Sequence, residues 1–200
     1  MLTFYHAPNS RSTLILALLR ELDAVDQVNL VRVDIPRQDG SGARDAANPH
    51  PEGKVPYLTD GDDWLRERGA ICLYLTDRFP AAGLGPLPDQ PGRGRYVSWL
   101  SYYQGVVEPV MIFDYLGLSH PALMATFRDM PAMFDRLDQA LAEGPYLLGD
   151  RFSAADLLIA SPFGYFPDML PDDRPAIRDW VGRVLARPSL AWAKAQDAAG

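Results

Sequence analysis

Residues 53–58 read Gly-Lys-Val-Pro-Tyr-Leu, and residues 67–71, which begin eleven positions after the proline, read Glu-Arg-Gly-Ala-Ile. A proline cannot donate to a β-ladder, so Pro56 belongs at a strand start, at an edge or in a turn. If the bond before it is cis, the backbone of Val55 turns outward, and its N–H and C=O are free to pair with an extended peptide. A charged residue that opens the next helix lies where backbone N–H groups favour an anion. Together the two stretches predict a receptor for a short peptide that ends in carboxylates.

The composition excludes several classes of function. The 200 residues include 26 acidic and 19 basic side chains, a net charge of −7, which argues against binding to nucleic acid or to an anionic membrane surface. Cys72 is the only cysteine, so no internal disulfide can form, as is typical of a reducing cytoplasm. The N-terminus has no signal-peptide pattern, and no stretch approaches the ~20 apolar residues of a membrane span. We expect a soluble, cytoplasmic protein.

The chain divides near residue 80. Before it, strand and helix patterns alternate: strands are expected at 2–6, 28–33, 57–59 and 64–65, and helices at 11–22 and 67–78. This βαβ-ββα order is that of a thioredoxin-like α/β fold. Residues 80–94 carry four prolines and four glycines and are expected to form a linker.

Beyond the linker the sequence contains only helical patterns. Helices are expected at about 95–116, 121–142, 153–166, 173–186 and 188–197. Pro109 should kink or end the first of them. We therefore expect a thioredoxin-like domain over 1–79, a linker over 80–94 and an all-α domain over 95–200.

A second motif lies in the helical part, where residues 149–157 read Gly-Asp-Arg-Phe-Ser-Ala-Ala-Asp-Leu. Ser153 can accept a hydrogen bond from the backbone N–H of Asp156, while the Asp156 carboxylate reaches back to the N–H of Ser153. This reciprocal pair is a capping box with Asp in the Glu/Gln role. Its role is structural: it fixes the start of a helix.

The two motifs, about a hundred residues apart, resemble those of the glutathione S-transferases. In that family the residue before a cis-proline pairs with the cysteinyl backbone of glutathione, and an acidic residue with its neighbour holds the γ-glutamyl end. The pattern Gly-x-x-x-Ser-x-Ala-Asp begins the buried helix of the second domain. The resemblance covers the whole chain and implies the two-domain fold of that family.

The resemblance places the chemistry at residues 6–13, His-Ala-Pro-Asn-Ser-Arg-Ser-Thr, where the family has the Tyr, Ser or Cys that hydrogen-bonds the glutathione sulfur. A free thiol has a pKa of ~8.5, which a hydroxyl donor and a helix N-terminus can lower. The loop contains no cysteine, so a glutaredoxin-like exchange and a Cys-type mechanism are both excluded. Ser10 is the first candidate and Ser12 the second. Alternatively the serines only cap the helix, and Asn9 is the donor.

Glutathione is the co-substrate that the resemblance implies, and six residues are expected to bind it: Asn9, Lys54, Val55, Pro56, Glu67 and Arg68. Arg68 departs from the serine usual in the family, and either pairs with the γ-glutamyl carboxylate or points to solvent. Lys54 reaches the glycyl carboxylate or is merely solvated.

No metal site is expected, because His6, His50 and His120 lack the spacing of metal ligands. Cys72 lies on an apolar helix and is expected to be a small core residue.

The helical domain is expected to bind the second substrate. It offers an aromatic-rich wall that includes Trp99, Tyr102, Tyr103, Val106, Val110, Phe113 and Tyr115. Most of these residues are expected to belong to the core or to a dimer contact, and only a minority to line a pocket. The candidates for that minority are Tyr102, Tyr103, Val106 and Val110. The wall and the family together imply a small apolar electrophile.

The reaction stays open among conjugation, peroxide reduction, isomerisation and dehalogenation. The main hypothesis is a homodimeric glutathione transferase that acts in detoxification. The alternative is a non-catalytic glutathione-binding or protein-interaction module of the same fold.

Overall fold

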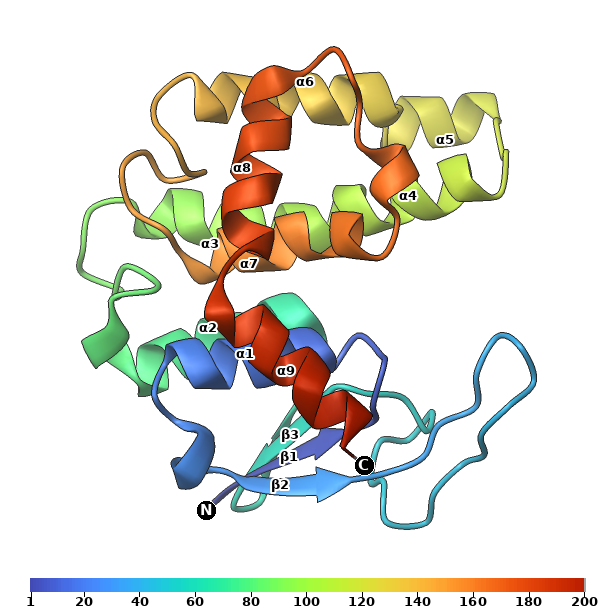
Figure 1. Ribbon diagram of the computed structural model, residues 1–200, viewed down its shortest axis with the longest axis vertical. Coiled ribbons are helices and arrows are strands. Elements are labelled where there is room, and N and C mark those ends of the chain that lie inside the picture. The colour runs from blue at the N-terminus through green and yellow to red at the C-terminus, as the bar shows by residue number, and fades with distance from the viewer. Residues whose placement is uncertain (200) are drawn as a thin grey trace. The chain divides into compact units, whose positions relative to one another are not determined.

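The structure of the protein is a computed structural model that describes residues 1–199 (Figure 1). The chain divides into two compact units. The first comprises Met1–Ala82 together with the described segment from Arg187 onward, and the second comprises Gly83–Ala186. The sequence assigns everything from residue 95 to the helical domain, whereas in the structure the last helix belongs to the first unit. This difference bears on the site, because the last helix supplies one of its carboxylates.

One mixed four-stranded sheet forms one layer of the first unit, with the strand order β2-β1-β3-β4. Strand β1 runs parallel to β2 and antiparallel to β3, and β3 pairs antiparallel with β4. The strands are β1 (Leu2–His6), β2 (Asn29–Arg32), β3 (Tyr57–Asp60) and β4 (Asp63–Leu65). The succession of strands and helices is the βαβ-ββα order that the sequence predicts.

Strand β1 ends in a fully buried histidine, His6. Leu2, Phe4 and His6 alternate with less buried residues along the strand, as they must when alternate side chains point to opposite faces of a sheet. A titratable ring therefore shares the core face with two apolar side chains.

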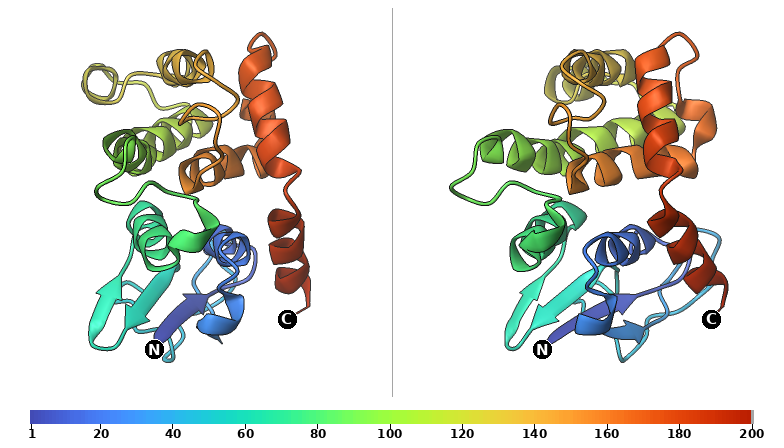
Figure 2. Two further views of the ribbon diagram at one scale, coloured as in Figure 1. Left: turned by 90° about the vertical axis from the view of Figure 1, so that its left-hand side faces the viewer. Right: turned by 60° about the vertical axis from the view of Figure 1, so that its left-hand side comes forward.

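The helices of the first unit pack beside the sheet (Figures 1 and 2). Helix α1 (Thr13–Glu21) contacts both α2 (Arg68–Arg78) and α9 (Pro188–Ala198). With neighbours on two sides, α1 is buried along almost its whole length. Short 3₁₀ turns at η1 (Val25–Gln27) and η2 (Pro80–Ala82) complete the unit.

Helix α9 is anchored to α1 at its N-terminal end. Arg187 donates to both carboxylate oxygens of Glu21, at 2.7 and 2.6 Å, and the Ser189 hydroxyl donates to the same carboxylate. Burial by itself would raise the pKa of Glu21, but the bonds from Arg187 and Ser189 hold that pKa below its ordinary value. Such a bidentate, charge-assisted pair is among the stronger polar contacts in proteins.

The described part of the second unit is helical, apart from an isolated bridge between Tyr146 and Gly149. Its elements are α3 (Arg93–Tyr102), η3 (Tyr103–Val107), α4 (Glu108–Tyr115), α5 (Pro121–Thr126), α6 (Met130–Leu141), α7 (Ala154–Ala160), η4 (Ser161–Gly164), η5 (Pro167–Met169) and α8 (Pro175–Leu185). Large side chains with almost no exposed surface form its core, among them Tyr96, Tyr103, Phe163 and Trp180.

The helix that contains Pro109 does not end there. Between α3 and α4 the chain winds as a π-helix over Tyr103–Val107, and Pro109 follows as the second residue of α4. A π-helical turn changes the hydrogen-bond spacing, and a proline is tolerated in the first turn of the helical segment that follows. The helical run predicted at 121–142 is instead interrupted, because Arg128 has a φ of 73° and Asp129 caps a new helix by accepting from the N–H of Ala132.

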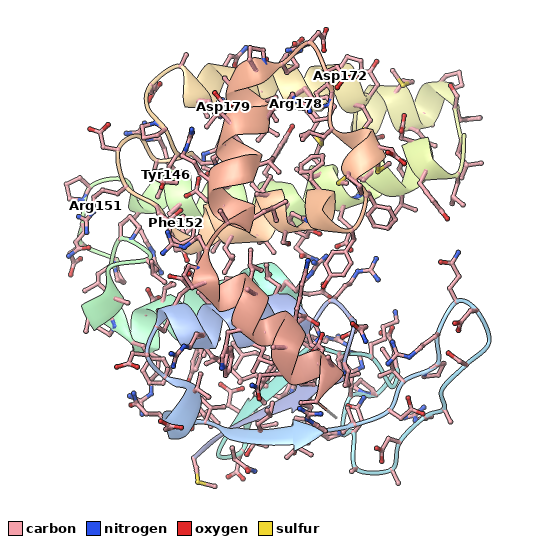
Figure 3. The ribbon with its side chains drawn as sticks, viewed as in Figure 1. Tyr146, Arg151, Phe152, Asp172, Arg178 and Asp179 are labelled. Atoms are coloured by element: carbon pink, nitrogen blue, oxygen red, sulfur yellow. The ribbon has the colours of Figure 1, made fainter. Side chains whose placement is uncertain are left out.

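A tight loop leads into α7 (Figure 3). The rings of Tyr146 and Phe152 meet edge to face with their centroids 5.7 Å apart, and Arg183 lies over the Tyr146 ring. Gly144 is required in this loop, because a Cβ there would lie 2.6 Å from the carbonyl carbon of Gly149. Two parts of the loop thereby pass close to one another, and the N–H of Leu147 between them bonds to Asp156 of α7.

The capping box predicted for Ser153 and Asp156 is present, and the carboxylate does more than cap. Asp156 accepts from the Ser153 N–H at 2.9 Å and its hydroxyl at 2.8 Å, from the Leu147 N–H at 2.8 Å and from the Trp180 ring N–H at 3.0 Å. Burial raises the pKa of Asp156, and these four donors oppose the rise. One carboxylate therefore joins the loop, α7 and α8.

Candidate functional site

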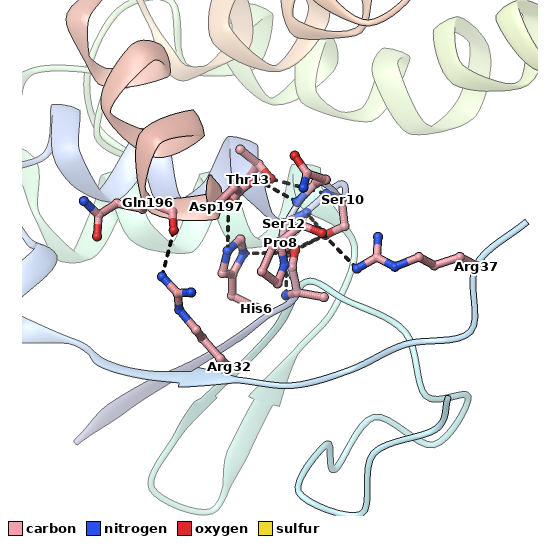
Figure 4. A network of polar contacts seen from close by, with 11 residues as sticks. His6, Pro8, Ser10, Ser12, Thr13, Arg32, Arg37, Gln196 and Asp197 are labelled. Atoms are coloured by element: carbon pink, nitrogen blue, oxygen red, sulfur yellow. Dashed lines mark hydrogen bonds and ion pairs between the residues drawn. The ribbon is translucent and has the colours of Figure 1, made fainter. Parts of the chain in front are cut away.

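The site centres on the loop between β1 and α1 (Figure 4). His6 ends the strand and Ala7 begins the loop, and neither has exposed surface. Ala7 packs in an apolar cluster with Val33 and Val55. This cluster brings the segment before Pro56 against the loop. Residues 6–13 and 53–58, which the sequence assigns to one binding site, are therefore neighbours in the structure.

Two serine hydroxyls lie in the loop, one behind the other. Ser10 is half-buried, and its Oγ lies 2.7 Å from both the carbonyl oxygen of Ala7 and the Oγ of Ser12. Ser12 has no exposed surface and accepts from the Ala7 N–H at 3.1 Å. Of the two predicted candidates, only Ser10 has surface that a ligand can reach without a rearrangement of the loop.

Behind Ser12 lies a buried imidazole. His6 Nδ1 is 2.7 Å from the Ser12 Oγ, and His6 Nε2 is 2.9 Å from Oδ1 of Asp197. Burial lowers the pKa of His6, while the Asp197 carboxylate raises it and Arg32 lowers it further. The net lowering keeps the ring neutral near pH 7.

Asp197 of α9 also holds the loop in place. Its Oδ2 accepts from the backbone N–H of Asn9 at 2.8 Å and from the hydroxyl of Thr13 at 2.6 Å. Asn9 has a φ of 52°, a left-handed conformation that asparagine tolerates better than most residues. Helix α9 thus fixes the conformation of the loop that precedes helix α1.

Arg37 supports the loop from the long connection between β2 and β3, where its guanidinium donates to the carbonyl oxygen of Pro8 at 3.0 Å (Figure 4). Neither Arg37 nor Asp197 stands out in the sequence, since nothing near them indicates contact with residues 7–13. The spacing of His6 excludes it only as a metal ligand, whereas its place at the end of an apolar alternating strand indicates a buried ring.

The remaining predicted glutathione ligands lie at the start of β3 and of α2. The Val55–Pro56 bond is cis, and both residues are buried. Lys54 is exposed and pairs with Glu52. Glu67 is exposed, with a φ of 69°, directly before α2. Arg68 is only 6% exposed, so the alternative that it points to solvent is wrong.

The predicted wall for a second substrate lies in the second unit, and its members differ in burial. Tyr103 and Val110 are core residues at 1% and 2% exposure, whereas Tyr102 and Val106 are half-buried. Burial raises the pKa of Tyr102, and Arg136 opposes that rise. Among the four residues sought for a pocket, Tyr102 and Val106 keep surface for a ligand, and Phe113 and Tyr115 of the wider wall also keep exposed surface.

Within residues 1–199, no group of three or more His, Cys, Asp or Glu side chains is placed to hold a metal ion. None of the helices in the same range is long and apolar enough to cross a membrane. Cys72 is fully buried, as the sequence predicts.

Comparison with known proteins gives consistent matches along the chain. Residues 3–86 match the glutathione S-transferase N-terminal domain, and residues 122–183 match the C-terminal domain of the same family. A glutathione S-transferase of Hyoscyamus muticus is 30% identical over 161 residues, which cover 73% of this chain and 75% of the relative.

Two further matches differ in how much they cover. A glutathione S-transferase of Arabidopsis thaliana is 29% identical over 163 residues, 72% of this chain and 63% of the relative, so the match spans less than two thirds of that protein. The solved structure of a sphingomonad glutathione S-transferase in complex with glutathione has a TM-score of 0.75 and 26% identity, and covers 99% of this chain and 100% of that one.

Proposed function

The chain belongs to the glutathione S-transferase family, and from that membership we propose that it binds glutathione in its first unit and activates the thiol through Ser10 for attack on an apolar electrophile. The observation that carries this proposal is the arrangement of the two serines. Ser10 is the half-buried outer hydroxyl at the start of α1, and Ser12 is the fully buried inner one.

The physical basis is stabilisation of a thiolate. A free thiol has a pKa of ~8.5, so only a few per cent is ionised at neutral pH. A hydroxyl donor beside the sulfur and the positive end of α1 both favour the anion. A hydrogen bond to a charged group contributes roughly 1.5–3 kcal/mol, which corresponds to about one to two pKa units.

We propose that the peptide part of glutathione is held by the residues around the loop. The cysteinyl backbone pairs with Val55 beside Pro56, and Glu67 holds the γ-glutamyl end. Arg68 and Lys54 supply positive charge for the two carboxylates, and Asn9 borders the sulfur from the exposed side of the loop. In support of this, the cluster of Ala7, Val33 and Val55 places the proline segment against the loop that carries Ser10.

The second substrate contacts the second unit in this proposal, through Tyr102 and Val106, which keep exposed surface. Their aromatic and aliphatic character favours an apolar electrophile, consistent with a role in detoxification in the cytoplasm.

The test of the mechanism is Ser10→Ala, with the exposed Ser98→Ala in the second unit as a matched control. We expect Ser10→Ala to lower kcat roughly ten- to a hundredfold and to leave glutathione affinity nearly unchanged, because other residues hold the peptide. The ultraviolet absorbance of the bound thiolate, followed against pH, should shift to higher pH in Ser10→Ala and stay in place in Ser98→Ala. An unshifted profile in Ser10→Ala would make Asn9 or a backbone N–H the donor. Glutathione that binds without any thiolate would favour the non-catalytic alternative.

We also propose a homodimer, as is usual for this family and common among soluble proteins. Light scattering at micromolar concentration should then give a mass about twice the 22.2 kDa of one chain. A stable particle of single-chain mass would refute the dimer without affecting the site.

A further inference from the structure

A continuous series of polar groups leads inward from the proposed sulfur position, all within the first unit (Figure 4). Ser10 Oγ lies 2.7 Å from Ser12 Oγ, which lies 2.7 Å from His6 Nδ1, and His6 Nε2 lies 2.9 Å from the Asp197 carboxylate. The last three residues are buried and Ser10 is half-buried. The series therefore has one end that a ligand can reach and one end closed off by a carboxylate.

The partners of the ring determine its tautomer. A carboxylate only accepts hydrogen bonds, so His6 Nε2 carries the hydrogen that faces Asp197. In the neutral ring Nδ1 then has a lone pair, and that lone pair faces the hydroxyl of Ser12. A carboxylate, an imidazole and a hydroxyl in this order are the elements of the proton-accepting triad of serine hydrolases.

The hydroxyl hydrogens can therefore all point inward at rest. Ser12 donates to His6 Nδ1 and still accepts from the Ala7 N–H. Ser10 donates either to Ser12 or to the carbonyl oxygen of Ala7, both at 2.7 Å. In the first of these arrangements one lone pair of Ser10 accepts from the Ser12 N–H at 3.1 Å, and the other is left to accept from a sulfhydryl group.

We propose that His6 accepts the proton of the bound glutathione thiol, relayed through the hydroxyls of Ser10 and Ser12. The S–H bond breaks and its proton bonds to Ser10 Oγ, while the Ser10 proton moves to Ser12 Oγ and the Ser12 proton moves to His6 Nδ1. The products are a thiolate, two reoriented hydroxyls and an imidazolium, and no proton leaves the protein. The reoriented Ser10 hydroxyl then donates to the thiolate, which is the contact required by the proposed function on which this inference rests.

Of the surroundings of the ring, Asp197 favours the protonated form, whereas burial and Arg32 disfavour it. The charged groups that face the ring are Asp197 from α9 and Arg32 from β2. Because burial disfavours a lone charge, the ring is neutral until a thiolate forms nearby. Transfer through the relay then creates the two opposite charges together and leaves the net charge of the site unchanged, with the imidazolium paired to Asp197. His6 loses its proton again along the same path, when the thiolate has been consumed and the product is released.

The direct test counts protons during glutathione binding. Wild-type protein is mixed with glutathione near pH 7 in weak buffer, with thiolate followed by its ultraviolet absorbance and released protons by an indicator dye. S-methylglutathione, which makes the same peptide contacts but has no thiol proton, supplies the background to subtract. We expect thiolate to form with close to no proton released, whereas one proton released per thiolate would overturn the proposal. If no thiolate forms at all, the proposed function itself fails, so the two failures are distinguishable.

Two variants break the relay at different points. In His6→Gln the amide can still donate to Asp197 but cannot take up a proton, and in Ser12→Ala the link between Ser10 and His6 is removed. Each should raise the pKa of the bound thiol towards ~8.5, and the thiolate that remains should appear with one proton released. Because only a few per cent of such a thiol is ionised near neutral pH, kcat should fall there roughly ten- to a hundredfold, and far less at alkaline pH, with KM for glutathione nearly unchanged.

The control variant is Glu21→Gln, which loosens α9 at its other end, where Arg187 and Ser189 bind. It should reduce stability and leave proton retention as in the wild type. If Glu21→Gln released protons to the same extent as His6→Gln, a loosened helix would explain the effect and the relay would be refuted. Because the wild-type count needs no substitution, the proposal stays testable even if His6→Gln does not fold.

Discussion

Replacement of Asp156 by Ala should destabilise the second unit far more than the loss of an ordinary helix cap. Three backbone or ring N–H groups, from Leu147, Ser153 and Trp180, lose their acceptor in this variant. Asp156 has no exposed surface, so water cannot readily replace the carboxylate.

The size of the effect follows from the number of orphaned donors. Each buried donor left without a partner costs about 1–3 kcal/mol, and such losses are not additive when the groups share one acceptor. We therefore expect Asp156→Ala to cost roughly 3–5 kcal/mol, a large share of the ~5–15 kcal/mol that stabilises a typical protein. A lost cap alone costs ~0.5–2 kcal/mol.

The assay is urea unfolding followed by tryptophan fluorescence, with Ser153→Ala as the matched variant. Ser153→Ala removes a hydroxyl but leaves the carboxylate with its three N–H donors, so it should stay within the ordinary cap range. Glutathione affinity of the folded protein should be the same in both variants, because the proposed ligands lie in the first unit. Equal losses for Asp156→Ala and Ser153→Ala would refute the reasoning, since the carboxylate would then act only as a cap.

Two further outcomes follow from pKa values. The bonds from Arg187 and Ser189 hold the pKa of Glu21 below its ordinary 4.5, so the stability they add is present above that pH and is lost as the pH falls through the lowered pKa. The melting temperature of Glu21→Gln should therefore decline less on acidification than that of the wild type. Parallel curves of melting temperature against pH for the two proteins would contradict this. Burial raises the pKa of the Cys72 thiol to about 12, so a thiol reagent should label the native protein only at the rate at which the protein opens locally around Cys72. Fast stoichiometric labelling at neutral pH would instead show an accessible thiolate.

Local patterns in the sequence are sufficient to predict most of the fold. Alternation of apolar residues marks the strands, turn residues separate them, and the Ser153–Asp156 motif marks a helix start without any knowledge of its neighbours. The errors lie where local patterns compete. Pro109 predicts a kink or an end of its helix, whereas the chain winds as a π-helix over Tyr103–Val107 and continues through Pro109 as α4. Asp129 and the residues around it end one helical run and start another.

The site was only partly predictable for a different reason. The loop and the proline segment are recognisable because their residues are contiguous in the sequence. Which serine is buried depends instead on His6 behind it and on Asp197, which is 191 residues from His6 in the chain. The pattern at 188–197 predicts a helix but not the unit on which that helix packs, so neither the carboxylate of α9 nor the support from Arg37 could be inferred.

The position of the glutathione sulfur in a solved complex tests the central claim most directly. We predict that the sulfur lies within about 3.5 Å of Ser10 Oγ, the range of a hydrogen bond, with the cysteinyl backbone paired to Val55. A sulfur that contacts Asn9 or a backbone N–H and lies beyond hydrogen-bond distance of Ser10 would contradict the account.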